Sequence, residues 1–312
     1  MQQQQQSRVD AVTGAFSYTG RFIARRLLGD GRRVRTLTNH AHRPGAEDLE
    51  AELEVEPLRF DDRARLIASL RGVDTLYNTY WVRFPRGRVD FDLAVANIRI
   101  LISAAEAAGV RKFVHISVSN PSAESRLAYY SGKARAEELV MKSKLQWSIV
   151  RPTLVFGPGD ILINNIAWMH RNLPVFGIPG LGDYRLQPVS AEDVASIALW
   201  AANSSENVTV DAAGPEIMTF QELVDQIAIA VKKRPRYVYM PPALFILAGW
   251  FVGLVTRDVV LTRQEVDGLM DELLVSSEPP RGTQRLDDWL LRNADTVGLH
   301  YASELGRNWR GR

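Results

Sequence analysis

Short apolar segments alternate with helix-forming segments through the first 151 residues of this 312-residue chain. Strands that alternate with helices at this spacing form right-handed βαβ units and a parallel sheet with helices on both faces. The pattern therefore predicts an α/β fold with a doubly wound parallel sheet. The predicted strands are residues 8–13, 33–38, 54–60, 73–80, 112–118 and 147–151, and the predicted helices are 21–28, 63–70, 89–108 and 131–143.

The alternation ends at Pro152, beyond which prolines and glycines become frequent. Helical patterns return at 191–202 and 220–231. We predict a second, smaller region from residue 152 to residue 312, some segments of which return to the sheet.

Composition excludes several classes of function. The formal charge is only +2, which indicates no nucleic-acid partner. The absence of cysteine excludes disulfides and thiolate sites, and the histidines show no ligand spacing beyond His40 and His42, so no metal site is expected. Residues 1–7 contain a polar glutamine tract with no apolar core. We expect a disordered leader rather than a secretory signal, and a cytoplasmic location.

A glycine-bracketed turn, Val12-Thr13-Gly14-Ala15-Phe16-Ser17-Tyr18-Thr19-Gly20, joins the first strand to the first helix. Backbone N–H groups and the positive dipole end of a helix face an anion at such a turn. Gly14 permits the sharp turn and Gly20 permits close helix–strand packing, whereas the middle glycine of the usual pattern is replaced by Ser17. We therefore expect dinucleotide binding over residues 8–151, with phosphate contacts from Gly14, Phe16, Ser17, Tyr18, Thr19 and Gly20.

The segment after the second strand, residues 38–43, has no carboxylate to hold a free ribose. Arg43 and the histidines His40 and His42 are candidates to face a 2′-phosphate, which favours NADP, with NAD as the alternative; a solvated arginine is the plainer interpretation. Asn39 of the same segment is a further candidate for cofactor binding. Asp61 follows the third strand and either accepts from the adenine amino group or caps the helix that begins at Arg63.

Tyr129 and Lys133 are four residues apart where the helix predicted at 131–143 opens, and residues at this spacing on a helix lie on one face. A tyrosine has an ordinary pKa of about 10, and a neighbouring ammonium lowers it toward the range useful in proton transfer. Ser119, after the fifth strand, is the candidate to hold the substrate oxygen, and Asn97 to orient a proton-relaying water. The alternative is that this tyrosine–lysine spacing has no catalytic role, because it also occurs by chance. Tyr130 could then be the buried aromatic side chain of this helix.

These motifs resemble the short-chain dehydrogenase/reductase superfamily in its extended or atypical branch, over roughly residues 8 to 230. Residues 151–160 resemble the segment that leads into the nicotinamide pocket in this branch, which implies cofactor contacts from Pro152, Thr153 and Val155. Residues 186–195 resemble the segment by which the chain returns to the cofactor domain. Within the branch, the chain is most similar to NmrA-like proteins and to the complex I accessory subunit of this fold. It keeps the tyrosine and lysine that inactive relatives lose, but it lacks the middle glycine of active ones.

The resemblance implies a Rossmann fold and an NAD(P)-dependent oxidoreductase or epimerase-like enzyme. In such an enzyme, Ser119, Tyr129 and Lys133 form a Ser-Tyr-Lys site. Hydride and proton transfer take place there at a carbonyl or hydroxyl carbon of a small molecule. Residues 152–312 are then mainly the substrate-binding region. The alternative is a non-catalytic NAD(P)-binding protein that stabilises an assembly or senses redox state. The oligomeric state stays open.

The stretch from Pro241 to Val255 carries no charge, but it is shorter than the roughly 20 apolar residues that span a membrane. A buried helix or apolar pocket wall is the favoured interpretation. The alternative is a patch that rests on a membrane surface or admits a lipophilic substrate.

Overall fold

The computed structural model of the chain describes residues 8–40, 43, 45–234 and 236–308; the predicted leader and His42 lie outside them. The chain forms two compact units. The first contains the described residues up to Pro152 together with Ala191–Ala212, and the second contains Thr153–Ser190 and the described residues from Ala213 on.

The first unit is built on a seven-stranded sheet in the order β11-β6-β5-β4-β1-β2-β3, whose paired strands all run parallel. The strands are β1 (Val9–Thr13), β2 (Arg33–Leu37), β3 (Glu54–Glu56), β4 (Val73–Asn78), β5 (Lys112–Ile116), β6 (Gln146–Pro152) and β11 (Val208–Ala212). The predicted doubly wound parallel sheet is confirmed.

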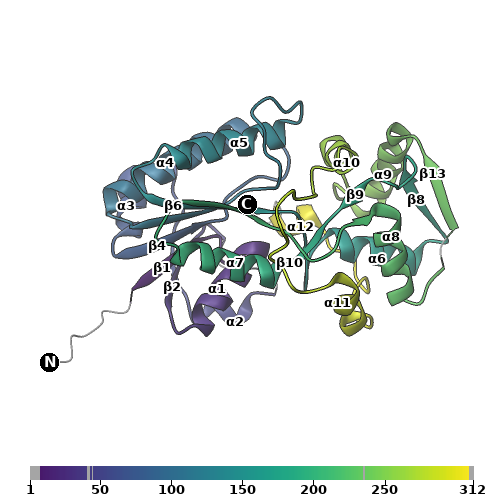
Figure 1. The fold of residues 1–312 in the computed structure, drawn as a ribbon, viewed down its shortest axis with the longest axis horizontal. Helices are drawn as coiled ribbons and strands as arrows, with labels where there is room; N and C mark the ends of the chain where they lie inside the picture. Colours follow the sequence, from purple (N-terminus) through teal and green to yellow (C-terminus); the bar gives the residue numbers. More distant parts are fainter. Residues whose placement is uncertain (1–7, 41–42, 44, 235, 309–312) are drawn as a thin grey trace. The chain divides into compact units, whose positions relative to one another are not determined.

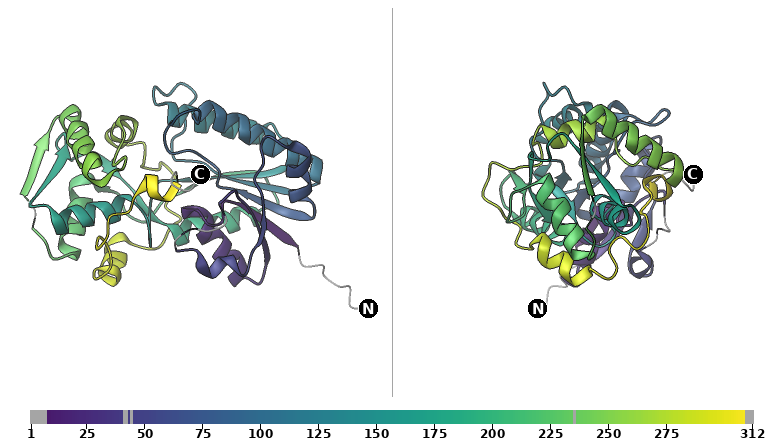
Figure 2. Two further views of the ribbon diagram at one scale, coloured as in Figure 1. Left: turned by 180° about the vertical axis from the view of Figure 1, so that it is seen from behind. Right: turned by 90° about the vertical axis from the view of Figure 1, so that its right-hand side faces the viewer.

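Helices cover both faces of this sheet (Figures 1 and 2). On one face lie α3 (Arg63–Leu70), α4 (Phe91–Ala108) and α5 (Ala128–Met141); on the other lie α1 (Tyr18–Gly29), α2 (Glu47–Glu50) and α7 (Ala191–Asn203). Together α7 and β11 return the chain to this unit after an excursion through the second.

Burial explains why the central strands have little polar alternation. All five residues of β1 and of β5 are buried, as expected for strands covered on both faces. The predicted third strand, residues 54–60, is too long, because β3 ends at Glu56. Pro57 follows it and has no N–H to continue the ladder.

The second unit packs helices against three two-stranded sheets, β7–β10, β9–β12 and β8–β13. Its elements are β7 (Leu154–Phe156), α6 (Leu162–Asn172), β8 (Val175–Pro179), β9 (Arg185–Leu186), β10 (Pro188–Ser190), β12 (Met218–Thr219), α8 (Phe220–Ala230), β13 (Arg236–Met240), α9 (Pro242–Thr256), α10 (Arg263–Met270), α11 (Leu286–Asn293) and α12 (Glu304–Asn308).

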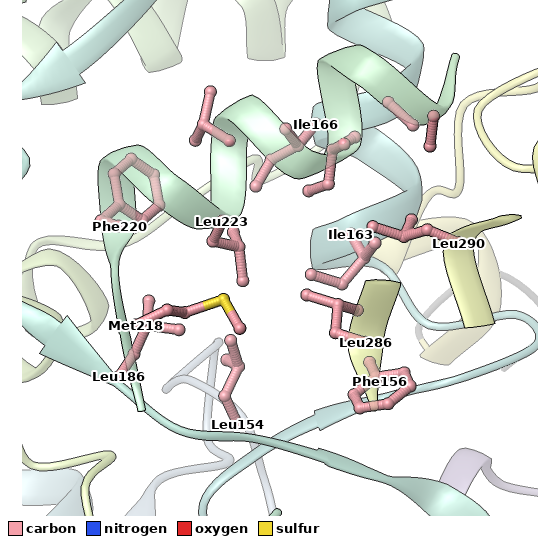
Figure 3. Close-up of a cluster of buried hydrophobic side chains, with 14 of the residues drawn as sticks. Leu154, Phe156, Ile163, Ile166, Leu186, Met218, Phe220, Leu223, Leu286 and Leu290 are labelled. Carbon is pink, nitrogen blue, oxygen red and sulfur yellow. The ribbon is translucent and has the colours of Figure 1, made fainter. Parts of the chain in front are cut away.

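One apolar cluster forms the core of this unit. Figure 3 shows Leu154 and Phe156 of β7 facing Ile163 of α6, Leu223 of α8 and Leu286 of α11. Among the described residues, this core contains side chains of β7, α6, β8, α8 and α11 and none of α9, the helix formed by the apolar stretch 241–255.

The apolar stretch 241–255 forms α9, but the favoured expectation that this helix is buried is wrong. Its large side chains are mostly exposed: Val255 is 85% exposed and Trp250 58%. Gly253 is the only residue of α9 that is buried. Among the described residues, no helix is both long and apolar enough to cross a membrane.

Candidate nucleotide-binding and catalytic site

The turn between β1 and α1 has the backbone geometry that its two glycines predict. Gly14 has a φ of +67°, in the left-handed region that favours glycine, and its N–H donates to Leu37 O at 2.9 Å. A Cβ on Gly20 would lie 2.2 Å from Gly14 O, which no side chain tolerates. The first helix therefore approaches β1 closely only because residue 20 is glycine.

Ser17, at the position of the missing middle glycine, does not close this turn. Its hydroxyl donates back to Gly14 O at 2.5 Å and makes no hydrogen bond to the first turn of α1, which carries no acidic side chain. Phe16 is 2% exposed, so its side chain lies in the interior. The 12-residue helix α1 thus presents the N–H groups of its first turn at an amino end that fits the phosphates of a dinucleotide.

Basic charge also lies beside this helix terminus. The Arg21 guanidinium lies 5.3 Å from the ring centre of Tyr18, and it donates to Gly45 O at 3.3 Å. Tyr18 packs edge-on against Phe22, while Thr19 is half-buried. Arg21 was not among the predicted site residues. The sequence signal for its place beside the turn is that it directly follows Gly20.

Asn39 and Arg43, which were predicted to contact the adenosine half of the cofactor, both lie in the loop after β2. Asn39 is exposed and donates to Leu58 O at 2.8 Å, which links the β2 loop to the segment after β3. Arg43 is half-buried, and its carbonyl accepts from Ala46 N. Each therefore takes part in holding the loop that follows β2.

Asp61 does not cap the next helix, so that alternative is wrong. The N-cap of α3 is Asp62, whose carboxylate accepts from Arg65 N at 3.0 Å. Asp61 instead forms a two-pronged ion pair with Arg59, both oxygens at 2.9 Å, and lies at the surface. Asp61 and Asp62 are adjacent, and the sequence pattern does not show which of them caps the helix.

A buried polar network joins the carboxyl ends of β1, β4 and β5. The Thr13 hydroxyl donates to Asn78 Oδ1 at 3.1 Å, and it accepts from Thr79 N at 2.8 Å. Asn78 Nδ2 lies 3.0 Å from His115 Nδ1. The strand order reverses between β1 and β4, and ligands of doubly wound sheets bind outside the carboxyl ends at such a point.

His115 is neutral within this network. Because Asn78 Oδ1 accepts from Thr13, the amide turns its Nδ2 donor to His115 Nδ1, which leaves the imidazole proton on Nε2. Burial, together with the charge of Lys133, holds the pKa of His115 well below its ordinary value. His115 therefore acts as a hydrogen-bond acceptor at the end of β5.

Lys133 is buried, with 3% of its surface exposed. Its ammonium donates to Ile116 O, the last carbonyl of β5, at 2.9 Å and lies 4.5 Å from the ring centre of Trp81. Burial lowers the pKa of Lys133 to about 7, and Glu137 on the next turn of α5 opposes this shift. A protonated and a neutral amine are therefore both accessible near neutral pH.

Tyr129 lies one turn before Lys133 on α5 and is half-buried among aromatic rings. Its ring is edge-on to Trp81 at 6.1 Å and to Phe91 at 5.8 Å. Tyr130 is the buried tyrosine of the pair, at 6% exposed. Gly132 permits this packing, because a Cβ there would lie 3.3 Å from the Trp81 ring.

Ser119 and Asn97 occupy buried positions on neighbouring elements. Ser119 N donates to Pro152 O at 2.9 Å, which extends the pairing with β6 beyond the end of β5. Asn97, on α4, donates from Nδ2 to the Tyr80 hydroxyl at 2.8 Å. The role predicted for Asn97 in orienting a water stays a prediction.

The remaining predicted cofactor residues follow β6. Pro152 ends β6 in the first unit, whereas Thr153 and Val155 belong to the second. Thr153 is buried and donates to Gln187 O at 2.5 Å, and Val155 pairs with Val189 across β7 and β10. These contacts hold the two resembled segments, 151–160 and 186–195, to each other.

Sequence reasoning missed the polar residues that surround Lys133. Glu137, buried on α5, forms an ion pair with Arg151 at 2.9 Å and 2.5 Å. The one available signal was the spacing of Tyr129, Lys133 and Glu137 at successive four-residue steps. Asn78 and His115 had a signal too, since polar residues at the ends of neighbouring parallel strands share one sheet edge.

Comparison with known proteins identifies the first unit. Residues 14–162 match the family model described as NAD(P)H-binding. NADH dehydrogenase (ubiquinone) 1 alpha subcomplex subunit 9, mitochondrial, from Arabidopsis thaliana is 26% identical over 247 residues, which are 75% of this chain and 60% of that protein. The chain therefore carries an NAD(P)H-binding domain, and the resemblance to a complex I accessory subunit is confirmed.

Solved structures share the fold. An NADPH-dependent quinone oxidoreductase from Escherichia coli, complexed with NADPH, superposes with a TM-score of 0.70 at 19% identity, covering 92% of this chain and 98% of that one. The triphenylmethane reductase of Citrobacter sp., complexed with NADP(H), gives 0.72 at 16% identity, covering 92% and 99%. The fold is that of NAD(P)-binding reductases and epimerases.

Proposed function

We propose that this protein is an NAD(P)-dependent oxidoreductase of the short-chain dehydrogenase type, with epimerase-like chemistry as a variant of the same site. One observation carries the proposal. Lys133 is buried beside the last carbonyl of β5, one helical turn from the half-buried Tyr129. A buried lysine next to a tyrosine at the carboxyl edge of a nucleotide-binding sheet supports proton transfer more than packing.

NAD(P), held by the first turn of α1 and by Lys133, would supply the hydride chemistry at the substrate carbon. Tyr129 exchanges a proton with the oxygen on that carbon, and Ser119 holds the same oxygen. Lys133 would hold the nicotinamide ribose, and its charge favours the Tyr129 phenolate. Asn97 orients a water that relays protons. Trp81 and Phe91 fix the Tyr129 ring by edge-on contacts, so little side-chain freedom is lost when a substrate binds.

The first turn of α1, from Ser17 through Gly20, would hold the pyrophosphate. We propose NADP as the preferred cofactor, because the loop after β2 offers Arg43 and no carboxylate between residues 38 and 43. The substrate is a small molecule, and the apolar character of the second unit favours a lipophilic one. We expect a cytoplasmic protein.

The test is a calorimetric titration of cofactor-stripped protein with NADPH and NADH, repeated with Lys133→Met. Loss of a charge-assisted hydrogen bond should weaken binding by about tenfold or more. Lys112→Met is the matched control. Lys112 is also a buried lysine of this unit, but it begins β5 and donates to Ser204 O and Glu206 O, so its removal should leave affinity unchanged.

Equal affinities of wild type and Lys133→Met would remove Lys133 from the nucleotide site and overturn the Ser-Tyr-Lys assignment. Absence of binding to either nucleotide would overturn the oxidoreductase proposal. A preference for NADH would reassign the loop after β2.

A second candidate function is non-catalytic binding of NAD(P) in a structural or redox-sensing role. It is favoured by the Arabidopsis relative, whose name places it in a respiratory complex, and by the serine at the position of the middle glycine. Tight nucleotide retention without turnover of quinones, hydroxysteroids or lipid carbonyls would support it over the enzyme.

A further inference from the structure

One face of α9 is apolar and turned away from the rest of the second unit. The exposed large side chains are Leu244, Leu247, Trp250, Phe251, Leu254 and Val255. They recur at helical spacing, so they form a single continuous surface, called here the α9 face. Each of these side chains is 49% exposed or more. Single exposed apolar residues are ordinary on a protein surface, but a continuous group of them indicates a contact surface.

The opposite side of α9 fixes the helix to its own unit. Figure 1 shows α9 alongside β8 and β13. A Cβ on Gly177 of β8 would lie 3.4 Å from the Phe245 ring, and a Cβ on Gly253 would lie 2.6 Å from Asp258 O. The Phe245 contact attaches α9 to β8, the Gly253 contact closes the turn that ends the helix, and the α9 face points outward.

Basic residues flank the apolar segment in the sequence. No charged residue occurs between residues 237 and 256, whereas Lys232, Lys233, Arg234 and Arg236 precede the segment and Arg257 follows it. These five are exposed, and no acidic residue occurs between 226 and 257. An apolar face with aromatic side chains and basic flanks complements an anionic lipid surface in both polarity and charge.

We propose that the α9 face binds the surface of an anionic phospholipid bilayer. The helix has 15 residues, fewer than the roughly 20 needed to cross, and therefore lies in the plane of the interface. Trp250 and Phe251 enter the boundary between headgroups and acyl chains, and the flanking lysines and arginines meet lipid phosphates. The proposal stands apart from the oxidoreductase activity, since it uses none of the residues of that site.

The experiment is co-sedimentation of the full chain with vesicles of phosphatidylcholine alone and of phosphatidylcholine mixed with phosphatidylserine. We expect binding to the mixed vesicles that weakens with salt. Trp250→Ser should weaken it roughly tenfold or more, because the burial of an aromatic side chain is lost. Lys232→Glu and Lys233→Glu should each weaken it by at least about fivefold.

Matched controls lie elsewhere on the surface. Leu181→Ser replaces a side chain that is 73% exposed outside α9, and Lys144→Glu reverses an exposed charge of the first unit; both should bind like wild type. Absence of vesicle binding by a folded wild type would overturn the proposal. So would equal binding by Trp250→Ser, or self-association that Trp250→Ser abolishes in analytical ultracentrifugation, which would make the face a contact between copies of this chain.

Discussion

The two units depart from ordinary burial in opposite directions. The first buries Lys112, His115, Lys133 and Glu137, each at most 3% exposed. The second leaves the apolar α9 face exposed while its core is filled by other elements. A buried charge costs desolvation free energy, and an exposed apolar face forgoes hydrophobic stabilisation.

The comparison teaches that each departure requires its own explanation. Of the four groups named above, His115, Lys133 and Glu137 lie at or near the carboxyl end of β5, where a polar cluster can bind and protonate a ligand. The α9 face has no polar group to perform chemistry, so it is suited to contact rather than catalysis. The predictions below test this division.

The largest expected effect is on turnover. Tyr129→Phe removes the hydroxyl that we propose exchanges the substrate proton, so kcat should fall by roughly 10²- to 10⁴-fold. The measurement is NADPH oxidation with a water-soluble quinone or a ketosteroid. Tyr130→Phe is the matched control, since Tyr130 is the buried neighbour and should retain kcat. Normal turnover by Tyr129→Phe would refute the assigned role.

A smaller effect is expected on stability, and its sign depends on pH. Lys133 has a folded pKa of about 7 and an unfolded pKa near 10.5, so between these values the unfolded chain binds more protons and the wild type gains stability as pH rises. Lys133→Met lacks this titration. Its stability relative to wild type should be highest below pH 7 and should decline toward about pH 10.5.

Denaturant unfolding of both proteins across this pH range measures the difference, with an upper limit of roughly 4–5 kcal/mol at about 1.4 kcal/mol per pKa unit. Lys112→Met should show the same sign over a narrower range, because burial lowers the pKa of Lys112 only to about 8. A difference that does not vary with pH would contradict the burial of a titrating lysine.

The smallest effect is expected at α9. Leu247→Gln replaces a side chain that is 49% exposed in an apolar helix, so the free energy of unfolding should change by no more than about 0.5 kcal/mol. Ile227→Gln on α8 is the contrasting change, since Ile227 is fully buried and a buried polar group should cost several kcal/mol. Comparable losses in the two variants would show that α9 is part of the core.

Much of the first unit was predictable because its patterns are local. Strand–helix alternation predicts a parallel sheet, and Gly14 and Gly20 mark the turn between β1 and α1 through backbone conformation alone. The helix that carries Tyr129 and Lys133 also follows from sequence spacing. The length of β3 and the choice between Asp61 and Asp62 as the cap of α3 were not predictable, because both depend on one-residue differences in backbone geometry.

The sequence by itself determined the parallel sheet, the glycine turn and the common helix of Tyr129 and Lys133, since each depends on residues within a few positions of one another. Only the tertiary structure decided that Lys133 is buried against Ile116 and Trp81, and that Thr13, Asn78 and His115 join three strands. It also decided that α9 faces outward: a helix apolar on every side has no periodicity to show which side is covered, so long-range packing settles its orientation.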